Sequence, residues 1–200
     1  MVTNEKITTT SIQLLSLSSK IISHILEARD PYTSNHSIFV ANHSKNLGKE
    51  LGFNELDSLW YGGLLHDIGK IAIPETTLQK PTALSHGEQD MMKRHTIYGV
   101  QLLQELEIPE VVKNCILYHH EAYDGSGYPE GLRGNEIPLE ARIVSVIDVF
   151  HALISDRPYR LGYPPEKALE TMKRESHRYD PNVLKIFISK CYPEILKKYK

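Results

Sequence analysis

The twelve residues LDSLWYGGLLHD, at positions 56–67, decide the fold class. Their apolar side chains recur every three or four residues, the spacing of one buried face of an α-helix: Leu56, Leu59, Trp60, Gly63 and Leu64. The next position on that face belongs to Asp67. Because an unpaired carboxylate is costly to bury, a core-facing aspartate requires a cation or hydrogen-bond donors beside it.

Three other predicted helices carry a ligand-type residue on their apolar face. These residues are His119 in 109–121, His95 in 85–106 and Asp148 in 139–154. Taken singly, an inward histidine is more often a hydrogen-bonded core residue, and a buried aspartate is more often paired with an arginine. Four such helices, without a matching set of inward lysines or arginines, favour bound cations instead.

Two dipeptides, His66-Asp67 and His119-His120, favour a site with two metal ions. Consecutive helical residues diverge by about 100°, so each dipeptide can reach two points as far apart as paired metal ions, roughly 3.5–4 Å. Mixed imidazole and carboxylate ligands suit iron, manganese or zinc better than magnesium or calcium. Lys70 follows His66 by one turn, on the side where it could bind a substrate phosphate.

The rest of the chain is also predicted to be helical. The expected helices span 11–29, 33–51, 54–65, 85–106, 109–121 and 139–154, followed by one that opens at Pro164-Pro165 and a last pair capped by Asp180-Pro181. Residues 122–138 contain four glycines and two prolines, which predicts a long loop, and such loops are usually functional or disordered. Without strand alternation, repeats or a linker, the sequence predicts a single all-α domain.

Composition limits the classes of partner. The chain has 200 residues, 40% of them apolar, which is enough for one domain with its own core. A net charge of −2 argues against binding to a nucleic-acid polymer or to a membrane surface. Two cysteines and no long apolar segment argue against a disulfide framework, a secretion signal and a membrane span. We therefore expect a soluble, cytoplasmic protein.

The residues HDIGK (66–70) and HHEAYDGSGYP (119–129) resemble the motifs of the HD-GYP family, cyclic dinucleotide phosphodiesterases within the HD-domain metallophosphohydrolases. The similarity extends from RDPYTSNH (29–36) to RPYR (157–160). It implies an all-α, HD-type helical domain with a binuclear metal centre in its core and a GYP loop beside it.

The same resemblance divides the chain into an HD-GYP domain at 29–200 and an N-terminal helix or linker at 1–28. This first segment is a candidate for dimerisation into a homodimer. Tyr32 stands where some family members have a glutamate that binds a third metal ion, so two ions are expected. Ala122 replaces an arginine that is common in the family, and this change removes no ligand.

The family's metal ligands correspond to seven positions of this chain: His36, His66, Asp67, His95, His119, His120 and Asp148. The resemblance implies that Asp67 bridges two divalent transition-metal ions. Iron or manganese is expected, with zinc or nickel as alternatives. The remaining histidines and Cys115 are expected not to bind metal: His24, His43, His86, His151 and His177.

The implied reaction is hydrolysis of a 3′,5′-phosphodiester of cyclic di-GMP to pGpG and, after a second cut, to GMP. A hydroxide bridging the metals would attack phosphorus, with Asp67 and Lys70 as the catalytic residues. Three groups are expected to contact the substrate: Lys70, the signature Gly127-Tyr128-Pro129, and the pair Arg157 and Arg160. A surface or ion-paired role is the alternative for both arginines.

Two other functions fit the same residues. One is a catalytically weak cyclic-dinucleotide sensor whose GYP loop contacts a signalling protein. The other is an HD phosphodiesterase that acts on another cyclic nucleotide, such as hybrid cyclic GMP-AMP. Formation of product would distinguish an enzyme from a sensor. Competition between substrates would show which cyclic nucleotide an enzyme prefers.

Overall fold

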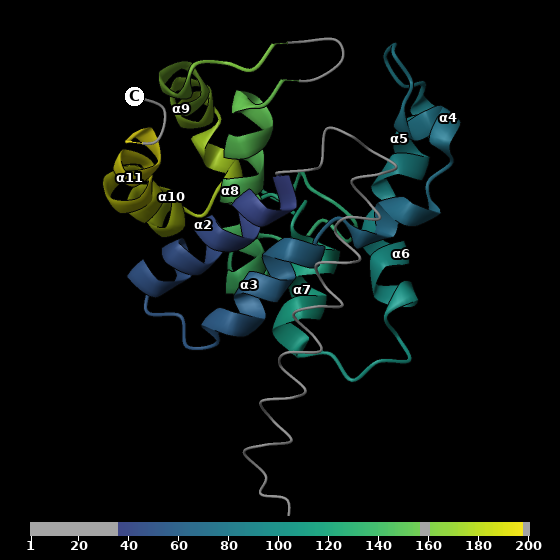
Figure 1. The fold of residues 1–200 in the computed structure, drawn as a ribbon, viewed down its shortest axis with the longest axis horizontal. Helices are drawn as coiled ribbons and strands as arrows, with labels where there is room; N and C mark the ends of the chain where they lie inside the picture. Colours follow the sequence, from purple (N-terminus) through teal and green to yellow (C-terminus); the bar gives the residue numbers. More distant parts are fainter. Residues whose placement is uncertain (1–35, 157–160, 198–200) are drawn as a thin grey trace, which may run out of the picture.

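A computed structural model describes residues 36–156 and 161–197 (Figure 1). Several sequence predictions lie outside the described residues: the helix at 11–29, the boundary at residue 28, His24, Tyr32, Arg157 and Arg160. Within the described ranges, no helix has both the length and the apolar character needed to cross a bilayer.

The described residues form helices and connecting segments without a β-strand, which confirms the all-α prediction. The longer helices are α2 (His36–Glu50), α3 (Leu56–Leu65), α5 (His86–Lys93), α6 (His95–Leu102), α7 (Glu110–Tyr118), α8 (Leu139–Ile154) and α9 (Pro165–Arg174). The shorter ones are α4 (Glu75–Leu78), α10 (Pro181–Ile186) and α11 (Tyr192–Leu196), with a π-helical turn at Phe187–Cys191 and 3₁₀ turns at Ile68–Ala72, Gly134–Glu136 and Ser176–Arg178.

Helix α8 is the centre of the larger of two apolar cores. Its residues Ile143, Val144, Ile147 and Phe150 are fully buried and recur at helical spacing. They pack with apolar side chains from α2, α9, α10 and α11. Burying each such side chain contributes about 1.5–3 kcal/mol relative to exposure. The nearly all-apolar sequence of α8 is therefore explained by contacts on several sides.

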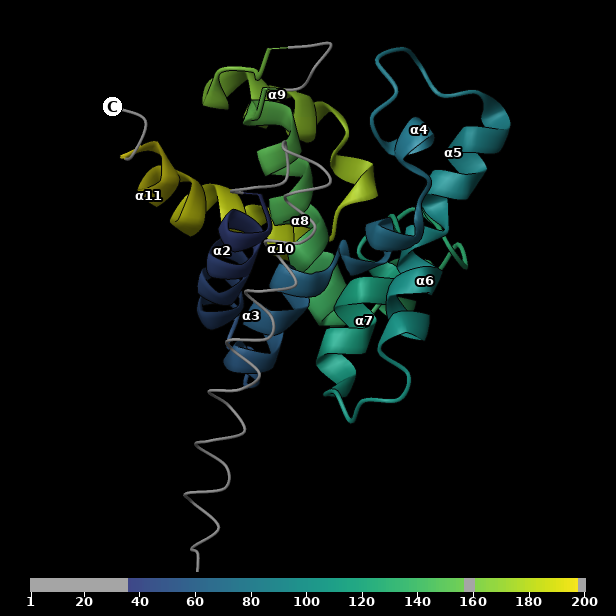
Figure 2. The ribbon, with the colours of Figure 1, turned by 45° about the vertical axis from the view of Figure 1, so that its right-hand side comes forward.

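A second core joins α3, α6 and α7. It contains Tyr61 and Leu65 of α3, Val112 and Ile116 of α7, and Leu103 just after α6. Figures 1 and 2 both show α4, α5 and α6 on the side of the molecule opposite α9, α10 and α11. Because α7 packs against α3, α6 and α8, its C-terminal end is held close to all of them.

Several predicted helix ends are confirmed. Gly52, with φ of 73°, follows α2, and this left-handed conformation is one that glycine adopts without strain. Ser85 and Glu88 form the predicted capping box at the start of α5. The Asp180 side chain accepts hydrogen bonds from the backbone of Asn182 and Val183 at the start of α10.

The prediction of one helix over 85–106 is wrong, because the structure divides it at Arg94 and ends it at Leu102. The Met92 carbonyl at the junction accepts hydrogen bonds from the Arg94 N–H and from Nδ1 of His95. A side chain that bonds to a nearby carbonyl competes with the regular helical ladder. The break between α5 and α6 therefore occurs where the His95 ring is oriented by the Met92 carbonyl.

Candidate metal centre

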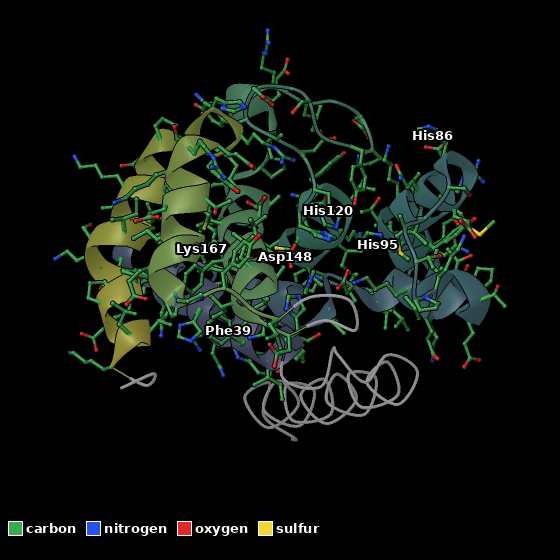
Figure 3. All side chains as sticks on the ribbon, turned by 90° about the horizontal axis from the view of Figure 1, so that it is seen from above. Phe39, His86, His95, His120, Asp148 and Lys167 are labelled. Carbon is green, nitrogen blue, oxygen red and sulfur yellow. The ribbon has the colours of Figure 1, made fainter. Side chains whose placement is uncertain are left out.

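The seven predicted ligands come from five parts of the fold and converge on one buried region. Figure 3 shows His95, His120 and Asp148 close together in the interior, whereas His86 lies at the periphery. Ligand-type atoms within 4.8 Å of one another define three overlapping groups: Asp67, His95, His119 and His120; His36, His66 and Asp67; and His66, His119 and Asp148. All seven side chains therefore belong to one cluster.

The dipeptides that carry four of these residues lie at helix ends. The sequence pattern extended the helical face as far as Asp67 and His119, but α3 ends at Leu65 and α7 ends at Tyr118. Both residues are nevertheless buried, with 3% and 1% exposure. The apolar faces predicted the burial correctly, although the residues occupy turns where the helices stop.

Three of the histidine rings are oriented by backbone carbonyl groups. Nδ1 of His66 donates to the Gly63 carbonyl at 2.8 Å, Nδ1 of His95 donates to that of Met92 at 2.7 Å, and Nδ1 of His119 donates to that of Cys115 at 2.9 Å. A carbonyl oxygen only accepts, so each Nδ1 carries a proton. In the neutral ring, Nε2 is then an unprotonated donor for a metal ion.

The Nε2 atoms of the cluster lie close to one another and to carboxylate oxygens. Nε2 of His95 lies 3.3 Å from Nε2 of His119, and Nε2 of His36 lies 3.3 Å from Nε2 of His66. Among the described residues, Oδ1 of Asp67 is buried without a hydrogen-bond partner. Lone pairs directed at one another and at a carboxylate suit a cation between them. The donor set therefore fits divalent metal ions.

Asp67 has a central place in this geometry, because its two oxygens face different nitrogen atoms. Oδ1 lies 3.3 Å from Nε2 of His95 and 3.9 Å from Nε2 of His119. Oδ2 lies 3.3 Å from Nε2 of His66 and 2.6 Å from Nζ of Lys70. On the other side of the cluster, Oδ1 of Asp148 lies 3.1 Å from Nε2 of His36.

Both carboxylates of the cluster are ionised in spite of their burial. Burial alone would raise the pKa of Asp67, but Lys70 and His66 hold it well below its usual value. Burial would likewise raise the pKa of Asp148, but the hydrogen bond and charge of His36 keep it well below the usual range. The cluster therefore favours the ionised form of both carboxylates, which is the form that binds a cation.

Most of the imidazoles are kept neutral, which is the form that binds a metal ion. Burial lowers the pKa of His120 to about 3, and burial also lowers the pKa values of His95 and His119. His66 differs, because the effect of burial is outweighed by Asp67 and its pKa is raised.

The loop that contains Gly127, Tyr128 and Pro129 lies against this cluster. The Tyr128 ring centroid is 4.8 Å from that of His120, and the Tyr128 N–H donates to the His120 carbonyl at 3.2 Å. Gly127 is pressed against the backbone of the preceding turn, since a Cβ atom there would lie 2.2 Å from the Ala122 nitrogen. The signature residues are therefore adjacent to the cluster through Tyr128.

Two residues next to the cluster were not identified from the sequence. Glu121 is buried, and its Oε1 accepts from the backbone N–H of Glu130 at 2.7 Å and of Gly131 at 3.1 Å. His151, expected to have no role in metal binding, has its Nδ1 2.8 Å from Nδ1 of His36. Its position three residues after Asp148, on the same helical face, was a sequence signal that it lies beside the cluster, although not that it meets His36.

Other expected non-ligands lie elsewhere. His86 is exposed. The ring centroids of His43 and Phe39 are 4.1 Å apart. His177 is exposed, and its Nε2 lies 3.7 Å from Oδ2 of Asp124. Cys115 is a buried free thiol in the larger core, and burial raises its pKa well above the usual value.

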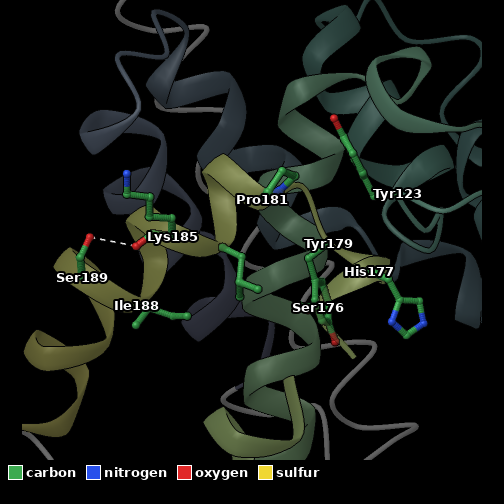
Figure 4. Close-up of a pocket in the computed structure, with 9 residues that line it drawn as sticks. Tyr123, Ser176, His177, Tyr179, Pro181, Lys185, Ile188 and Ser189 are labelled. Carbon is green, nitrogen blue, oxygen red and sulfur yellow. Dashed lines mark hydrogen bonds between the residues drawn. The ribbon is translucent and has the colours of Figure 1, made fainter. Parts of the chain in front are cut away.

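An apolar groove of about 660 Å³ lies outside the His/Asp cluster (Figure 4). Its walls include Tyr123, Tyr179, Leu184 and Ile188, and none of the seven predicted ligands lines it. The groove lacks the convergent ligand atoms that the cluster provides, so we place the candidate chemistry at the cluster.

Comparison with known proteins assigns the family. A family model described as HD domain matches residues 20–183. The chain is 37% identical over 155 residues to 3′3′-cGAMP-specific phosphodiesterase 3 of Vibrio cholerae and 37% identical over 186 residues to a cyclic di-GMP phosphodiesterase of Thermotoga maritima. These matches cover 76% and 90% of the chain, but only 34% and 50% of the respective relatives, so the chain spans half or less of their length.

A solved structure agrees with the fold. Bd1817, an HDG"Y"P protein from Bdellovibrio bacteriovorus, superposes with a TM-score of 0.65 and 24% identity, covering 92% of this chain and 62% of that one. The chain belongs to the HD-domain family, and its predicted membership of the HD-GYP group within that family is confirmed.

Proposed function

We propose that this chain is a metal-dependent phosphodiesterase that hydrolyses a 3′,5′-phosphodiester of cyclic di-GMP. The observation that carries the proposal is the arrangement around Asp67, whose two oxygens face separate sets of histidine Nε2 atoms. Carboxylates that bridge two ions are typical of sites that displace a phosphate ester. The names of the relatives support a cyclic dinucleotide as substrate.

The proposed ligands form two sets that share Asp67. His36, His66 and Asp148 would hold one ion, and His95, His119 and His120 would hold the other. When bound, iron or manganese ions would lower the pKa of water and stabilise charge on the phosphoryl oxygens. The backbone carbonyls behind His66, His95 and His119 keep each Nε2 directed inward, so little rearrangement is needed on loading.

Lys70 is the proposed phosphate-binding residue. Its ammonium group lies 2.6 Å from Asp67, and its side chain remains 25% exposed, at the boundary between the cluster and solvent. A positive charge there can contact a phosphoryl oxygen while the carboxylate contacts metal. We also propose Tyr128 beside His120 as a substrate contact, together with Gly127, Pro129, Arg157 and Arg160.

The test is anaerobic incubation of the purified chain with cyclic di-GMP and Fe(II) or Mn(II), with products resolved by chromatography. Wild type and His86→Ala should form pGpG or GMP, whereas Asp67→Ala should form neither. His86 serves as the matched control because it is an exposed histidine away from the cluster. Absence of product from metal-loaded wild type would overturn the proposal.

A second substrate also has support from the names of the relatives. The protein named for 3′3′-cGAMP and the one named for cyclic di-GMP are each 37% identical to this chain. Hybrid cyclic GMP-AMP is therefore the alternative, and it shares the same phosphodiester chemistry. Incubation with an equimolar mixture decides between them, because the preferred substrate is consumed first.

A further inference from the structure

The side chain of His151 contacts Nδ1 of His36, whereas Nδ1 of His66, His95 and His119 contacts backbone carbonyl groups. His151 lies in α8, one turn after Asp148, and is 8% exposed. Its Nδ1 is 2.8 Å from Nδ1 of His36, and the two ring centroids are 5.0 Å apart. The separation of the two nitrogens is that of a hydrogen bond, so one must donate and the other must accept.

The Nδ1 partner of His36 differs in kind from those of three other histidines in the cluster. His66, His95 and His119 each donate from Nδ1 to a backbone carbonyl, an acceptor that fixes which nitrogen carries the proton. His36 instead faces an imidazole, which can either donate or accept depending on its tautomer. The protonation pattern of His36 is therefore set by a side chain.

The His151 ring is held in place by its neighbours. Its centroid lies 4.0 Å from that of Phe39, at an interplanar angle of 30°. The hydroxyl group of Ser155 lies 3.2 Å from its Nδ1. A ring restrained in this way presents its nitrogen to His36 in a defined direction.

We propose that His151 is a positioning residue for the metal ion that His36 binds. The inference rests on the proposed function only in taking His36 as a ligand through Nε2. A bound ion requires an unprotonated Nε2, so His36 must then carry its proton on Nδ1 and donate it to Nδ1 of His151. His151 accordingly has its own proton on Nε2 in the loaded protein.

Without an ion the direction of the hydrogen bond can reverse. Nε2 of His36 lies 3.1 Å from Oδ1 of Asp148, an acceptor for an N–H at that position. His36 protonated on Nε2 would then accept at Nδ1 from His151. Loading of the ion therefore selects one of two tautomers for each ring, and this is a change that packing alone does not produce.

The experiment uses zinc as the probe, because it is diamagnetic. In the chain labelled with ¹⁵N at histidine, long-range ¹H–¹⁵N spectra of the zinc-loaded protein should show His36 protonated on Nδ1 and His151 protonated on Nε2. His36→Gln and His151→Asn assign the two signals. A loaded His36 protonated on Nε2 would overturn the proposal.

Matched substitutions test the effect on affinity by competition with a chelator. His151→Leu, which removes the acceptor, should weaken binding of one zinc ion about 10-fold to 100-fold. His151→Asn places a carbonyl oxygen near the position of Nδ1 and should bind within about threefold of wild type. His86→Leu should bind as wild type does. Circular dichroism and thermal unfolding of the metal-free variants establish that each is folded.

Equal affinities for wild type and His151→Leu would overturn the inference, and so would equal losses in the Leu and Asn variants. These outcomes test the role of His151 independently of whether the chain hydrolyses cyclic di-GMP. Zinc binding with the expected variant pattern, but no hydrolysis of cyclic di-GMP by the iron- or manganese-loaded wild type, would reject the phosphodiesterase and retain the role of His151. Failure of wild type to bind zinc would reject both.

Discussion

Nζ of Lys70 lies 2.6 Å from Oδ2 of Asp67, so the proposed phosphate-binding residue is paired with the proposed bridging ligand. The ammonium group repels a cation at the same carboxylate. Lys70→Met should therefore bind manganese about tenfold more tightly, a change of ~1.4 kcal/mol. It should also hydrolyse cyclic di-GMP about 10²-fold to 10³-fold more slowly, because a charge that stabilises the phosphoryl group is lost.

Manganese titration and single-turnover kinetics measure these two opposite effects of Lys70→Met. Lys45→Met is the control, since Lys45 forms an exposed ion pair with Asp57. A variant that loses both metal affinity and turnover would instead show that Lys70 supports the metal site itself.

Glu121 should determine the position of the loop that carries Tyr128. Its Oε1 accepts from the backbone N–H groups of Glu130 and Gly131. Glu121→Ala leaves these donors without that acceptor and should lower the free energy of unfolding by about 1–3 kcal/mol. Glu121→Gln keeps an acceptor oxygen at the same place, so its free energy of unfolding should fall by less. Urea unfolding measures the free energy of unfolding of both variants. Equal decreases in the two variants would refute the role of the acceptor.

Gly127 should tolerate no larger residue. A Cβ atom there would lie 2.2 Å from the Ala122 nitrogen and 2.5 Å from Cα of Glu121, and these backbone atoms cannot rotate away. Gly127→Ala should therefore lower the free energy of unfolding by about 1–3 kcal/mol. Gly87 in α5 has no atom within 4 Å of such a Cβ, so Gly87→Ala should be neutral or stabilising by up to ~1 kcal/mol. Unfolding curves of the pair test the contrast.

Binding of metal should stabilise the fold, because ions that bind only the native cluster shift the equilibrium away from the unfolded chain. Manganese at 100 times its dissociation constant should add about 2.7 kcal/mol, raising Tm by roughly 5–10 °C. Chelation should reverse the rise, and Asp67→Ala should show a smaller one. Scanning calorimetry measures all three, and an unchanged Tm in wild type would argue against a native metal site.

The buried ligand-type residues could be predicted because helical periodicity is local. The apolar faces before Asp67 and His119 predicted burial of both, even though α3 and α7 end one or two residues earlier. The caps at Ser85 and Asp180 were likewise encoded within three residues of sequence. In each case the determining contacts lie within one or two helical turns.

Other features depended on contacts between distant segments. His36 and His151 are 115 residues apart, so no local pattern predicts that their rings meet. The division at Arg94 accompanies the bond from the His95 ring to the Met92 carbonyl, and that ring orientation is also part of the contact with His119. Such features follow from the assembled fold, which periodicity alone does not specify.

Glu88 should make the stability of α5 depend on pH. Hydrogen bonds from Lys80 and from Ser85 lower the pKa of the Glu88 carboxyl from its ordinary 4.5 to about 2. A carboxyl whose pKa is lower in the folded state stabilises that state above the ordinary pKa, and it loses this effect as pH falls through the folded value. The contribution should therefore be complete above pH 4.5 and disappear toward pH 2.

Glu88→Gln lacks this titration and provides the comparison. At pH 6 the amides of α5 should exchange faster in Glu88→Gln than in wild type, and the difference should shrink as the pH is lowered from 4.5. Hydrogen exchange, corrected for the intrinsic rate at each pH, measures it. Exchange in α7 serves as the internal control, because Glu88 bonds to Lys80 and Ser85, and neither residue belongs to α7. A difference that stays constant down to pH 3 would show that Glu88 acts through packing and not through its charge.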